Sequence, residues 1–401
     1  MNVVFISRRF YPEVVGGGQL SGFYIAKSVK NQGNKVDVIT FSDKNKEIVI
    51  DGIKIHVLKI STLNSFPKLS NMDYMYIQMA RLSSKHIRKI DPDIIHLLNW
   101  ESIPLSAVYY KLRFRKRIVA TANGPIFGCF TQNSIDYNGR TCINCQVLKR
   151  LRCATSNWGS VKGLFYYLYS LYFMNMLKFS YKYVDSFAAV SSAMVPLLEN
   201  IGIPRKKIEI IHNPVEIKKK EQTDLKKRLG IKGKVIIYVG RLAKAKGVQH
   251  TINAMRDVNA TFLVIGEKRD YYDKLNQLVK ELKLEKKVIF VGFVENNRLV
   301  DYYSIADAAV HVPDFFEPYS RFLIEACSFG IPIVASNIGG NKDIIDGNGI
   351  LVQKIETLSV SINGVLSKAN VYKNNSLKLA RELSLDSIGK KYNDLYLKNL
   401  S

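Results

Sequence analysis

Two glutamates at the start of and within one predicted helix form the part of the sequence best suited to chemistry. The helix begins at Pro318, where proline is tolerated, and ends at Gly330, so Glu317 lies just before it and Glu325 two turns into it. Apolar neighbours in this helix predict that the Glu325 carboxylate is partly buried and needs hydrogen-bond donors. Sugar hydroxyls are suitable donors. The purely structural alternative is that Glu317 caps the helix and Glu325 pairs with a lysine.

A second candidate is a loop that carries two cations. The predicted strand at 235–240 runs into Gly240, Arg241 and, a few residues later, Lys246. Arginine offers a bidentate fork and lysine a point charge, so the two together suit a diphosphate. In a chain this basic, two solvated side chains are the plainer alternative.

A third candidate is the run of three glycines at 16–18. It follows the first predicted strand and precedes a helix, whose N-terminal N–H groups can bind an anion that the glycines allow to approach. The spacing is not the GxGxxG pattern, so we do not expect NAD. A flexible turn would explain the glycines equally well.

Short β-branched strands alternate with helices and position these loops. Strands buried on both faces and separated by helices predict parallel sheets, with a ligand site at the carboxyl ends of the strands. The first series is expected at 2–7, 36–41, 93–98, 117–121 and 186–191, and the second at 235–240, 261–266, 287–291, 308–312 and 332–336. A Lys-rich stretch at 216–234 separates the two series. The tail at 379–400 is expected to be helical.

The composition is that of a globular protein with a strong basic excess. The 401 residues are enough for two domains, and 59 Lys and Arg against 34 Asp and Glu give a net charge of +25. Such a surface favours a polyanionic partner, although Lys-rich solvated faces are common. The most apolar run free of charge, Gly163–Leu177, is too short to span a bilayer. We therefore expect a cytoplasmic protein that is peripheral, at most, on the inner face of a membrane.

Short motifs recur in a fixed order along nearly the whole chain. They are Tyr11-Pro12 with Gly16–Gly18, Asp91-Pro92-Asp93, Ile211-His212-Asn213-Pro214, Gly240-Arg241-Leu242 with Lys246-Gly247, Glu317-Pro318 with Glu325-Ala326, Gly330-Ile331-Pro332, and Gly339-Gly340. With this set the chain resembles the retaining glycosyltransferases of family 4, which have the GT-B fold. The resemblance implies an α/β protein of two Rossmann-like domains facing across a central cleft. Residues 1–215 would bind the acceptor, 216–380 the nucleotide-sugar, and the helix at 381–401 would cross back to the first domain.

The resemblance also implies a role for each matching residue. Arg241 and Lys246 would hold the leaving diphosphate, Glu325 the ribose, and Glu317 the donor sugar. Further contacts to the donor would come from Gly17, Gly18, Gly240, Gly266, Tyr319, Ser320, Arg321 and Phe322. Transfer would retain the anomeric configuration without a metal, with the leaving phosphate taking the proton of the acceptor. The expected partners are a nucleotide-diphosphate sugar and a glycan or lipid-pyrophosphate-linked acceptor in cell-surface polysaccharide or glycoconjugate synthesis, and no nucleic acid.

The sequence departs from the family pattern at several site positions. Asn123 stands where the family commonly has histidine, so it can hydrogen-bond a donor hydroxyl but cannot act as an acid or base near pH 7. Ser320 replaces a glycine, and Arg321 replaces an aliphatic residue. These departures keep two alternatives open: an epimerase of the same fold, and a non-catalytic binder of nucleotide-sugars.

Two further segments have no place in this scheme. Cys129, Cys142, Cys145 and Cys153 fall within 25 residues and include one CxxC pair, which suggests a structural zinc or iron–sulfur site or else reduced thiols. The aromatic stretch at 165–183 is expected to be a buried helix. The alternative is a helix that seats the protein on an anionic membrane surface, helped by the basic run at 111–117.

Overall fold

The computed structural model divides the chain into two compact units. Unit 1 comprises Met1–Pro214 and Leu385–Ser401, and unit 2 comprises Val215–Ser384. The structure describes residues 1–13, 16–61, 68–99, 102–124, 129, 134, 136–138, 142, 145–268 and 271–401. Two residues of the glycine loop, Val14 and Val15, and Pro125 of the segment after Asn123 lie outside the described residues.

Unit 1 is built on one sheet with the strand order β3-β4-β2-β1-β5-β6-β7-β8. All of its strands run parallel except the edge strand β3, which pairs antiparallel with β4. The strands are β1 (Asn2–Ile6), β2 (Lys35–Ser42), β3 (Lys46–Ile50), β4 (Ile53–Lys59), β5 (Ile94–Leu98), β6 (Arg117–Ala122), β7 (Ser186–Ala189) and β8 (Ile208–Ile210). The central strands are apolar on both faces and almost fully buried, as helices on both sides of a sheet require.

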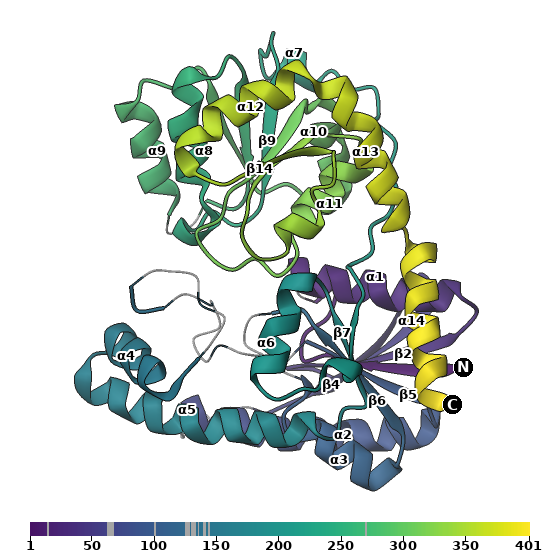
Figure 1. The fold of residues 1–401 in the computed structure, drawn as a ribbon. Helices are drawn as coiled ribbons and strands as arrows, with labels where there is room; N and C mark the ends of the chain where they lie inside the picture. Colours follow the sequence, from purple (N-terminus) through teal and green to yellow (C-terminus); the bar gives the residue numbers. More distant parts are fainter. Residues whose placement is uncertain are drawn as a thin grey trace. The chain divides into compact units, whose positions relative to one another are not determined.

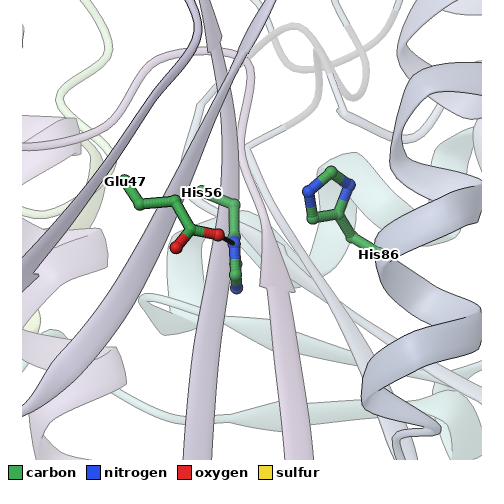
Figure 2. A group of neighbouring side chains, drawn as sticks. All are labelled: Glu47, His56 and His86. Carbon is green, nitrogen blue, oxygen red and sulfur yellow. Dashed lines mark hydrogen bonds and ion pairs between the residues drawn. The ribbon is translucent and has the colours of Figure 1, made fainter.

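Helices cover both faces of this sheet. One set consists of α1 (Gly17–Asn31) and α14 (Leu385–Leu400), which pack against each other, and the other face carries α2 (Lys68–Ile90), α3 (Ser106–Phe114) and α5 (Ser160–Tyr181) (Figure 1). The helix α4 (Val147–Trp158) packs on α5, and the short α6 (Val195–Asn200) precedes β8. At the β3 edge, Glu47 and His56 lie side by side, with His86 of α2 across from them (Figure 2).

A buried hydrogen-bond chain ties α14 to the unit 1 sheet. His96 of β5 bonds through Nδ1 to the Tyr396 hydroxyl at 2.5 Å and through Nε2 to the Thr121 hydroxyl at 2.7 Å. Burial lowers the pKa of His96 to about 3, so the imidazole is neutral at physiological pH. The C-terminal helix is therefore an integral part of unit 1.

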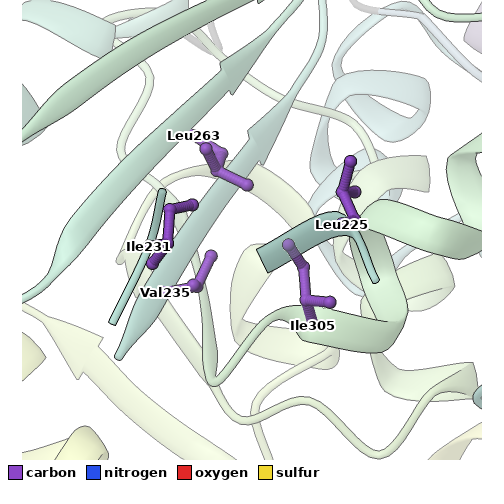
Figure 3. Packing of buried hydrophobic residues seen from close by; sticks show 5 residues of the cluster. All are labelled: Leu225, Ile231, Val235, Leu263 and Ile305. Carbon is purple, nitrogen blue, oxygen red and sulfur yellow. The ribbon is translucent and has the colours of Figure 1, made fainter. Parts of the chain in front are cut away.

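Unit 2 has a six-stranded parallel sheet in the order β11-β10-β9-β12-β13-β14. Its strands are β9 (Val235–Val239), β10 (Thr261–Ile265), β11 (Val288–Gly292), β12 (Ala308–His311), β13 (Ile333–Ser336) and β14 (Gly349–Val352). Its helices are α7 (Leu225–Arg228), α8 (Val248–Ala254), α9 (Tyr272–Glu281), α10 (Leu299–Ile305), α11 (Arg321–Ser328), α12 (Leu358–Ser367) and α13 (Ala369–Glu382). Figure 3 shows a cluster of buried apolar side chains from α7, the loop after it, β9, β10 and α10: Leu225, Ile231, Val235, Leu263 and Ile305.

Three expectations from the sequence need correction. The helix expected from Pro318 begins at Arg321, because Pro318 to Ser320 belong to the loop after β12. The tail is two helices, since α13 ends at Glu382 and Val215 pairs with the intervening Ser384. The aromatic helix α5 is buried over much of its second half, but its first half exposes an apolar row that is described with the surface below.

Candidate functional site

The candidate residues of unit 2 gather where the strand order reverses. The strand β9 lies between β10 and β12, and the carboxyl ends of strands at such a reversal are where ligands bind in open α/β sheets. The β9 loop carries Arg241 and Lys246, and the β12 loop carries Glu317. Residues that are 71 positions apart in the sequence are thereby brought into contact.

Backbone-to-backbone contacts hold these loops in place, and glycine is required at each contact. A Cβ atom would overlap a carbonyl oxygen at three positions: Gly247 at 1.8 Å from Val312, Gly266 at 2.0 Å from Gly240, and Gly339 at 2.1 Å from Glu317. The φ angles of Gly247 and Gly339 are also positive, +73° and +58°. The sheet therefore presents the site on loops that cannot move apart without losing these contacts.

The centre of the site is a charged cluster around Glu317. Lys246 donates from Nζ to Glu317 Oε2 at 2.7 Å, and His311 Nε2 lies 3.3 Å from the same oxygen. The Lys246 ammonium also lies 4.5 Å from the centre of the Phe315 ring, a cation–π contact. Glu317 thus forms an ion pair and does not cap α11, so the helix-capping role considered from the sequence is wrong.

Electrostatics keep the Glu317 carboxylate charged. Burial alone raises its pKa, but the ammonium of Lys246 and the hydrogen bond from His311 outweigh burial and bring the pKa down to about 2. Burial lowers the pKa of His311 in spite of the opposing effect of Glu317. The result is a permanent hydrogen-bond acceptor beside a cation, an arrangement suited to bind hydroxyls and an anion next to each other.

Glu325 is held by one hydrogen-bond donor and one cation. The Tyr303 hydroxyl donates to Glu325 Oε2 at 3.1 Å, and Arg321 Nε lies 2.9 Å from Oε1, one turn earlier on α11. The lysine partner considered from the sequence is therefore wrong: the cation is Arg321. Because these contacts fix the carboxylate, its remaining lone pairs point in defined directions.

The remaining donor-side candidates lie at the start of α11 and in the β9 and β10 loops. Ser320 occupies the N-cap position of α11, and Tyr319 and Phe322 are buried. Phe322 packs against the Tyr238 ring, whose hydroxyl donates to the Arg241 carbonyl at 3.0 Å. Arg241 itself is exposed, so its guanidinium reaches solvent at the rim of this cluster.

The candidates of unit 1 form a separate group at the carboxyl edge of its sheet. Gly17 and Gly18 are the first residues of α1, which follows β1, and the α1 N-cap residue Gly16 makes no side-chain cap. Asn123 follows β6 and donates to the side chain of Asn99, which follows β5. Asn99 in turn donates to the Ser7 hydroxyl at 3.2 Å. Polar amides and helix N–H groups therefore share this edge.

Three residues of these groups were missed by reasoning from sequence: His311, Tyr303 and Asn99. Each had a weak signal. His311 and Asn99 stand at, or one residue after, the carboxyl end of an apolar strand, where a polar side chain reaches the ligand edge. Tyr303 lies on α10 and gives no local sign that it reaches Glu325, because that contact depends on the packing of two helices.

The four cysteines lie in one neighbourhood of unit 1. Burial raises the pKa of the Cys153 thiol, and the nearby Cys145, Cys129 and Cys142 thiols act in the same direction. Across the part of the chain that the structure describes, ligand-bearing side chains come within 4.8 Å of one another as a group of three only at Glu47, His56 and His86. The zinc or iron–sulfur site at the cysteines stays a prediction.

The helices α2, α3 and α5, which cover one face of the unit 1 sheet, expose apolar and basic side chains, and we call their outer surface the α2–α5 face. On α5 its apolar members recur every three or four residues over the first half and continue to the second: Val161, Leu164, Phe165, Leu168, Tyr172 and Phe179. On α2 and α3 a cavity of about 550 Å³ is lined by Arg81, Ser84, Lys85, Arg88, Lys89 and Tyr109. In the described ranges, no helix is both long and apolar enough to cross a bilayer.

Two family models match the chain, one after the other. Residues 15–219, more than half of the chain, match the model described as Glycosyltransferase Family 4. Residues 220–378 match the model described as Glycosyl transferases group 1. The first match lies in unit 1 but for its last few residues, and the second lies within unit 2.

Individual proteins agree with these matches. An uncharacterized glycosyltransferase of Methanocaldococcus jannaschii is 24% identical over 428 aligned positions, which cover 99% of this chain and 98% of the relative. The sucrose-phosphate synthase of Thermosynechococcus elongatus has a similar fold, with a TM-score of 0.77 at 18% identity over 99% of this chain and 98% of the other. The Anabaena protein HepE in complex with UDP gives a TM-score of 0.71 at 19% identity over 99% and 100%. The predicted α/β fold class of the GT-B glycosyltransferases is confirmed, and the chain belongs to the group 1, family 4 glycosyltransferases.

Proposed function

We propose that this glycosyltransferase moves a sugar from a nucleotide-diphosphate sugar to a glycan or lipid-linked acceptor with retention of the anomeric configuration. Unit 2 binds the donor. The single observation that carries this proposal is the cluster of Lys246, Glu317 and His311 at the carboxyl ends of β9 and β12. The fixed carboxylate of Glu325 follows on α11.

Each side chain of the cluster has a role in this reaction. In the absence of donor, Lys246 pairs with Glu317. When the donor binds, Lys246 turns to the diphosphate and stabilises it as it leaves, together with the exposed Arg241. Glu317 accepts hydrogen bonds from the donor sugar and Glu325 from the ribose. Because the leaving phosphate accepts the acceptor proton, Asn123 need not act as a base, and the reaction needs no metal.

The donor is best sought among UDP-sugars. HepE, which shares the fold, is known as complexes with UDP and with UDP-glucose. The identity of 18–19% does not transfer that specificity, so UDP-glucose serves as the first probe.

Calorimetric titration of nucleotide-sugars into the full chain tests the donor site. We expect binding of one nucleoside diphosphate, weakened about tenfold or more by Glu325→Gln, since a hydrogen bond to a charged group contributes about 1.5–3 kcal/mol. Glu356→Gln, an exposed change elsewhere in unit 2, is the matched control and is expected to leave binding unchanged. Equal affinity of wild type and Glu325→Gln would contradict the assignment of this site.

Product analysis tests the reaction. Incubation with the donor that binds and a pool of glycan and lipid-pyrophosphate acceptors is expected to give a product whose anomeric proton coupling matches that of the donor. Inversion would refute the proposed stereochemistry. Conversion of the nucleotide-sugar without an acceptor would support the epimerase alternative, and binding with no turnover would support the non-catalytic one.

The acceptor is proposed to lie at the cytoplasmic face of an anionic membrane, where the α2–α5 face docks. The helices α3, α4 and α5 contain no acidic residue, and the cavity on α2 and α3 is lined by four cations. Apolar side chains insert at the headgroup boundary while lysines and arginines pair with lipid phosphates, so the two features reinforce each other.

Co-sedimentation with vesicles tests this docking. We expect the full chain to bind vesicles that contain phosphatidylglycerol and not neutral phosphatidylcholine vesicles, with binding lost at high salt. Phe165→Ser removes an exposed aromatic from the face and is expected to weaken binding severalfold, whereas Val360→Ser, at an exposed site of unit 2, leaves it unchanged. Binding that is independent of lipid charge, or of Phe165, would contradict this docking surface.

A further inference from the structure

Three side chains that the glycosyl-transfer site does not use meet at the edge of the unit 1 sheet. Glu47 lies on the edge strand β3, His56 on β4, and His86 on the helix α2 that covers this face (Figure 2). One ligand atom from each, a carboxylate oxygen and two ring nitrogens, lie within 4.8 Å of one another. This is a mixed set of imidazole and carboxylate groups, which is the usual ligand set for divalent transition metals.

His56 is fixed from both sides by carboxylates. Its Nδ1 lies 2.8 Å from Glu47 Oε1, and its Nε2 lies 3.0 Å from Oδ1 of Asp37, a buried residue on β2. An ionised carboxylate accepts hydrogen bonds and does not donate them. Each of these two nitrogen–oxygen contacts therefore requires a proton or a metal ion between its atoms. If Nε2–H donates to the Asp37 carboxylate, Nδ1 is left to bind the metal. Metal-binding histidines commonly donate their second ring N–H to a carboxylate in this way.

His86 completes the set from the helix. Its ring centre lies 5.0 Å from that of His56, with the rings inclined by 55°. Its Nδ1 is buried and has no hydrogen-bond partner among the residues that the structure describes. A buried ring nitrogen without a partner is available to a ligand.

We propose that Glu47, His56 and His86 bind a divalent transition-metal ion of the zinc class, with water in the fourth position. Zinc ligands lie about 2.0–2.2 Å from the metal, which places them roughly 3.3 Å apart in a tetrahedron. The Glu47–His56 contact of 2.8 Å is already close to that separation, and side-chain rotation that shortens a distance of at most 4.8 Å brings in His86. Glu47 is the flexible member, because its side chain is 56% exposed and its other oxygen pairs with Lys54 at 3.1 Å.

The competing arrangement is a protonated His56 that bridges Asp37 and Glu47 with no metal. This arrangement explains the positions of His56, Asp37 and Glu47. It gives no role to His86, whose ring also faces His56 (Figure 2). A bound ion accounts for all three ligands and for Asp37 behind them. Its consequence is structural: it joins the exposed edge hairpin of β3 and β4 to α2.

Metal titration of the full chain, stripped with a chelator, tests the proposal. We expect one Zn²⁺ per chain in this site and a rise in the unfolding temperature of unit 1 of about 5 °C at saturation. Bound Co²⁺ is expected to show the visible spectrum of nitrogen and oxygen ligands, without the near-ultraviolet charge transfer of a thiolate. A stripped chain that takes up no metal would overturn the proposal.

Two variants and two controls locate the ion. His86→Phe keeps a ring packed against His56 and is expected to abolish the zinc-dependent temperature rise while leaving the metal-free unfolding temperature within about 1 °C. Glu47→Gln, at an exposed position, is expected to weaken zinc binding at least tenfold and keeps the test valid if His86→Phe fails to fold. His250→Phe in unit 2 and Cys145→Ser in the cysteine cluster are expected to bind as wild type does. A zinc-dependent temperature rise that survives both His86→Phe and Glu47→Gln, or that is lost in Cys145→Ser, would place the ion elsewhere and refute the site.

Discussion

Replacing Lys246 by methionine removes the charge that keeps Glu317 ionised and preserves most of the side-chain volume. Lys246 Nζ lies 2.7 Å from Glu317 Oε2, and the two side chains are only 19% and 13% exposed. The pKa of Glu317 falls from 4.5 to about 2 although burial raises it, and each pKa unit corresponds to about 1.4 kcal/mol. Because His311 supplies part of this effect, we expect Lys246→Met to lower the free energy of unfolding of unit 2 by about 2–3 kcal/mol at pH 7.

The assay must report on unit 2 alone. Both tryptophans, at positions 100 and 158, fall in the sequence range of unit 1, so their fluorescence does not report the unfolding of unit 2. Hydrogen exchange of peptides from β12 and α11 gives the free energy of opening at the site itself. Measured for Lys246→Met, Glu317→Gln and the double variant, it forms a double-mutant cycle. The double variant is expected to be about 2 kcal/mol more stable than additivity predicts, because it leaves no unpaired carboxylate.

The pH dependence provides an independent check. A depressed folded-state pKa contributes stability that is complete above the unfolded value of 4.5 and is lost as the pH falls toward 2. Glu317→Gln is expected to flatten this part of the profile. Lys244→Met, at an exposed position in the same loop, is the control and is expected to change the opening free energy by less than about 0.5 kcal/mol. A coupling energy within about 0.5 kcal/mol of zero would refute the reasoning and leave Lys246 with a role in ligand binding alone.

Three further predictions concern stability. Tyr396→Phe removes the hydroxyl bonded to the buried His96 and is expected to cost unit 1 about 1–2 kcal/mol, measured by tryptophan fluorescence in urea; an unchanged midpoint would contradict the tether. Because burial holds the pKa of His96 at about 3, unit 1 is expected to be fully stable above pH 6.5 and to lose stability as the pH falls from 6.5 toward 3, and a flat series of urea midpoints over that range would exclude this. Gly247→Ala brings a Cβ to 1.8 Å from the Val312 carbonyl at a positive φ and is expected to destabilise unit 2 by about 2 kcal/mol or more in calorimetry, whereas Gly233→Ala, with open space around it, has little effect.

Ten of the parallel strands could be predicted from the sequence because their residues are buried and form continuous apolar runs, whereas the parallel strands β4, β8 and β14 were missed. In the β3–β4 hairpin, β3 has no continuous apolar run, because it is an edge strand and mostly exposed, with polar residues such as Lys46 and Glu47. Its one clear signal was Asp51-Gly52, whose positive φ angles of 50° and 70° form the tight turn between the two strands. Hydrophobic periodicity therefore identified the central strands well, and missed β3, β4, β8 and β14, which lie at or next to the edge of a sheet.

The site could be predicted as a set of residues but not as a set of contacts. Lys246 and Glu317 were both candidates, yet their ion pair depends on β9 lying next to β12, which is a property of the strand order. Local rules also placed the start of α11 at Pro318, because proline is favoured in a first turn. The chain instead uses Pro318 to Ser320 in the loop whose backbone packs against Gly339, a tertiary contact that no local pattern reveals.

The arginine at the start of α11 shows how the departures from the family pattern fit together. A cation at a helix N-terminus is unfavourable, because the helix dipole places partial positive charge there. Arg321 is nevertheless buried, and Glu325 one turn later neutralises it at 2.9 Å. The same contact leaves Glu325 with a fixed orientation, supported by Tyr303 on its other oxygen. An aliphatic residue at position 321 would remove the unfavourable charge and, with it, one of the two contacts that orient Glu325, so this departure serves the carboxylate that the proposed donor site requires.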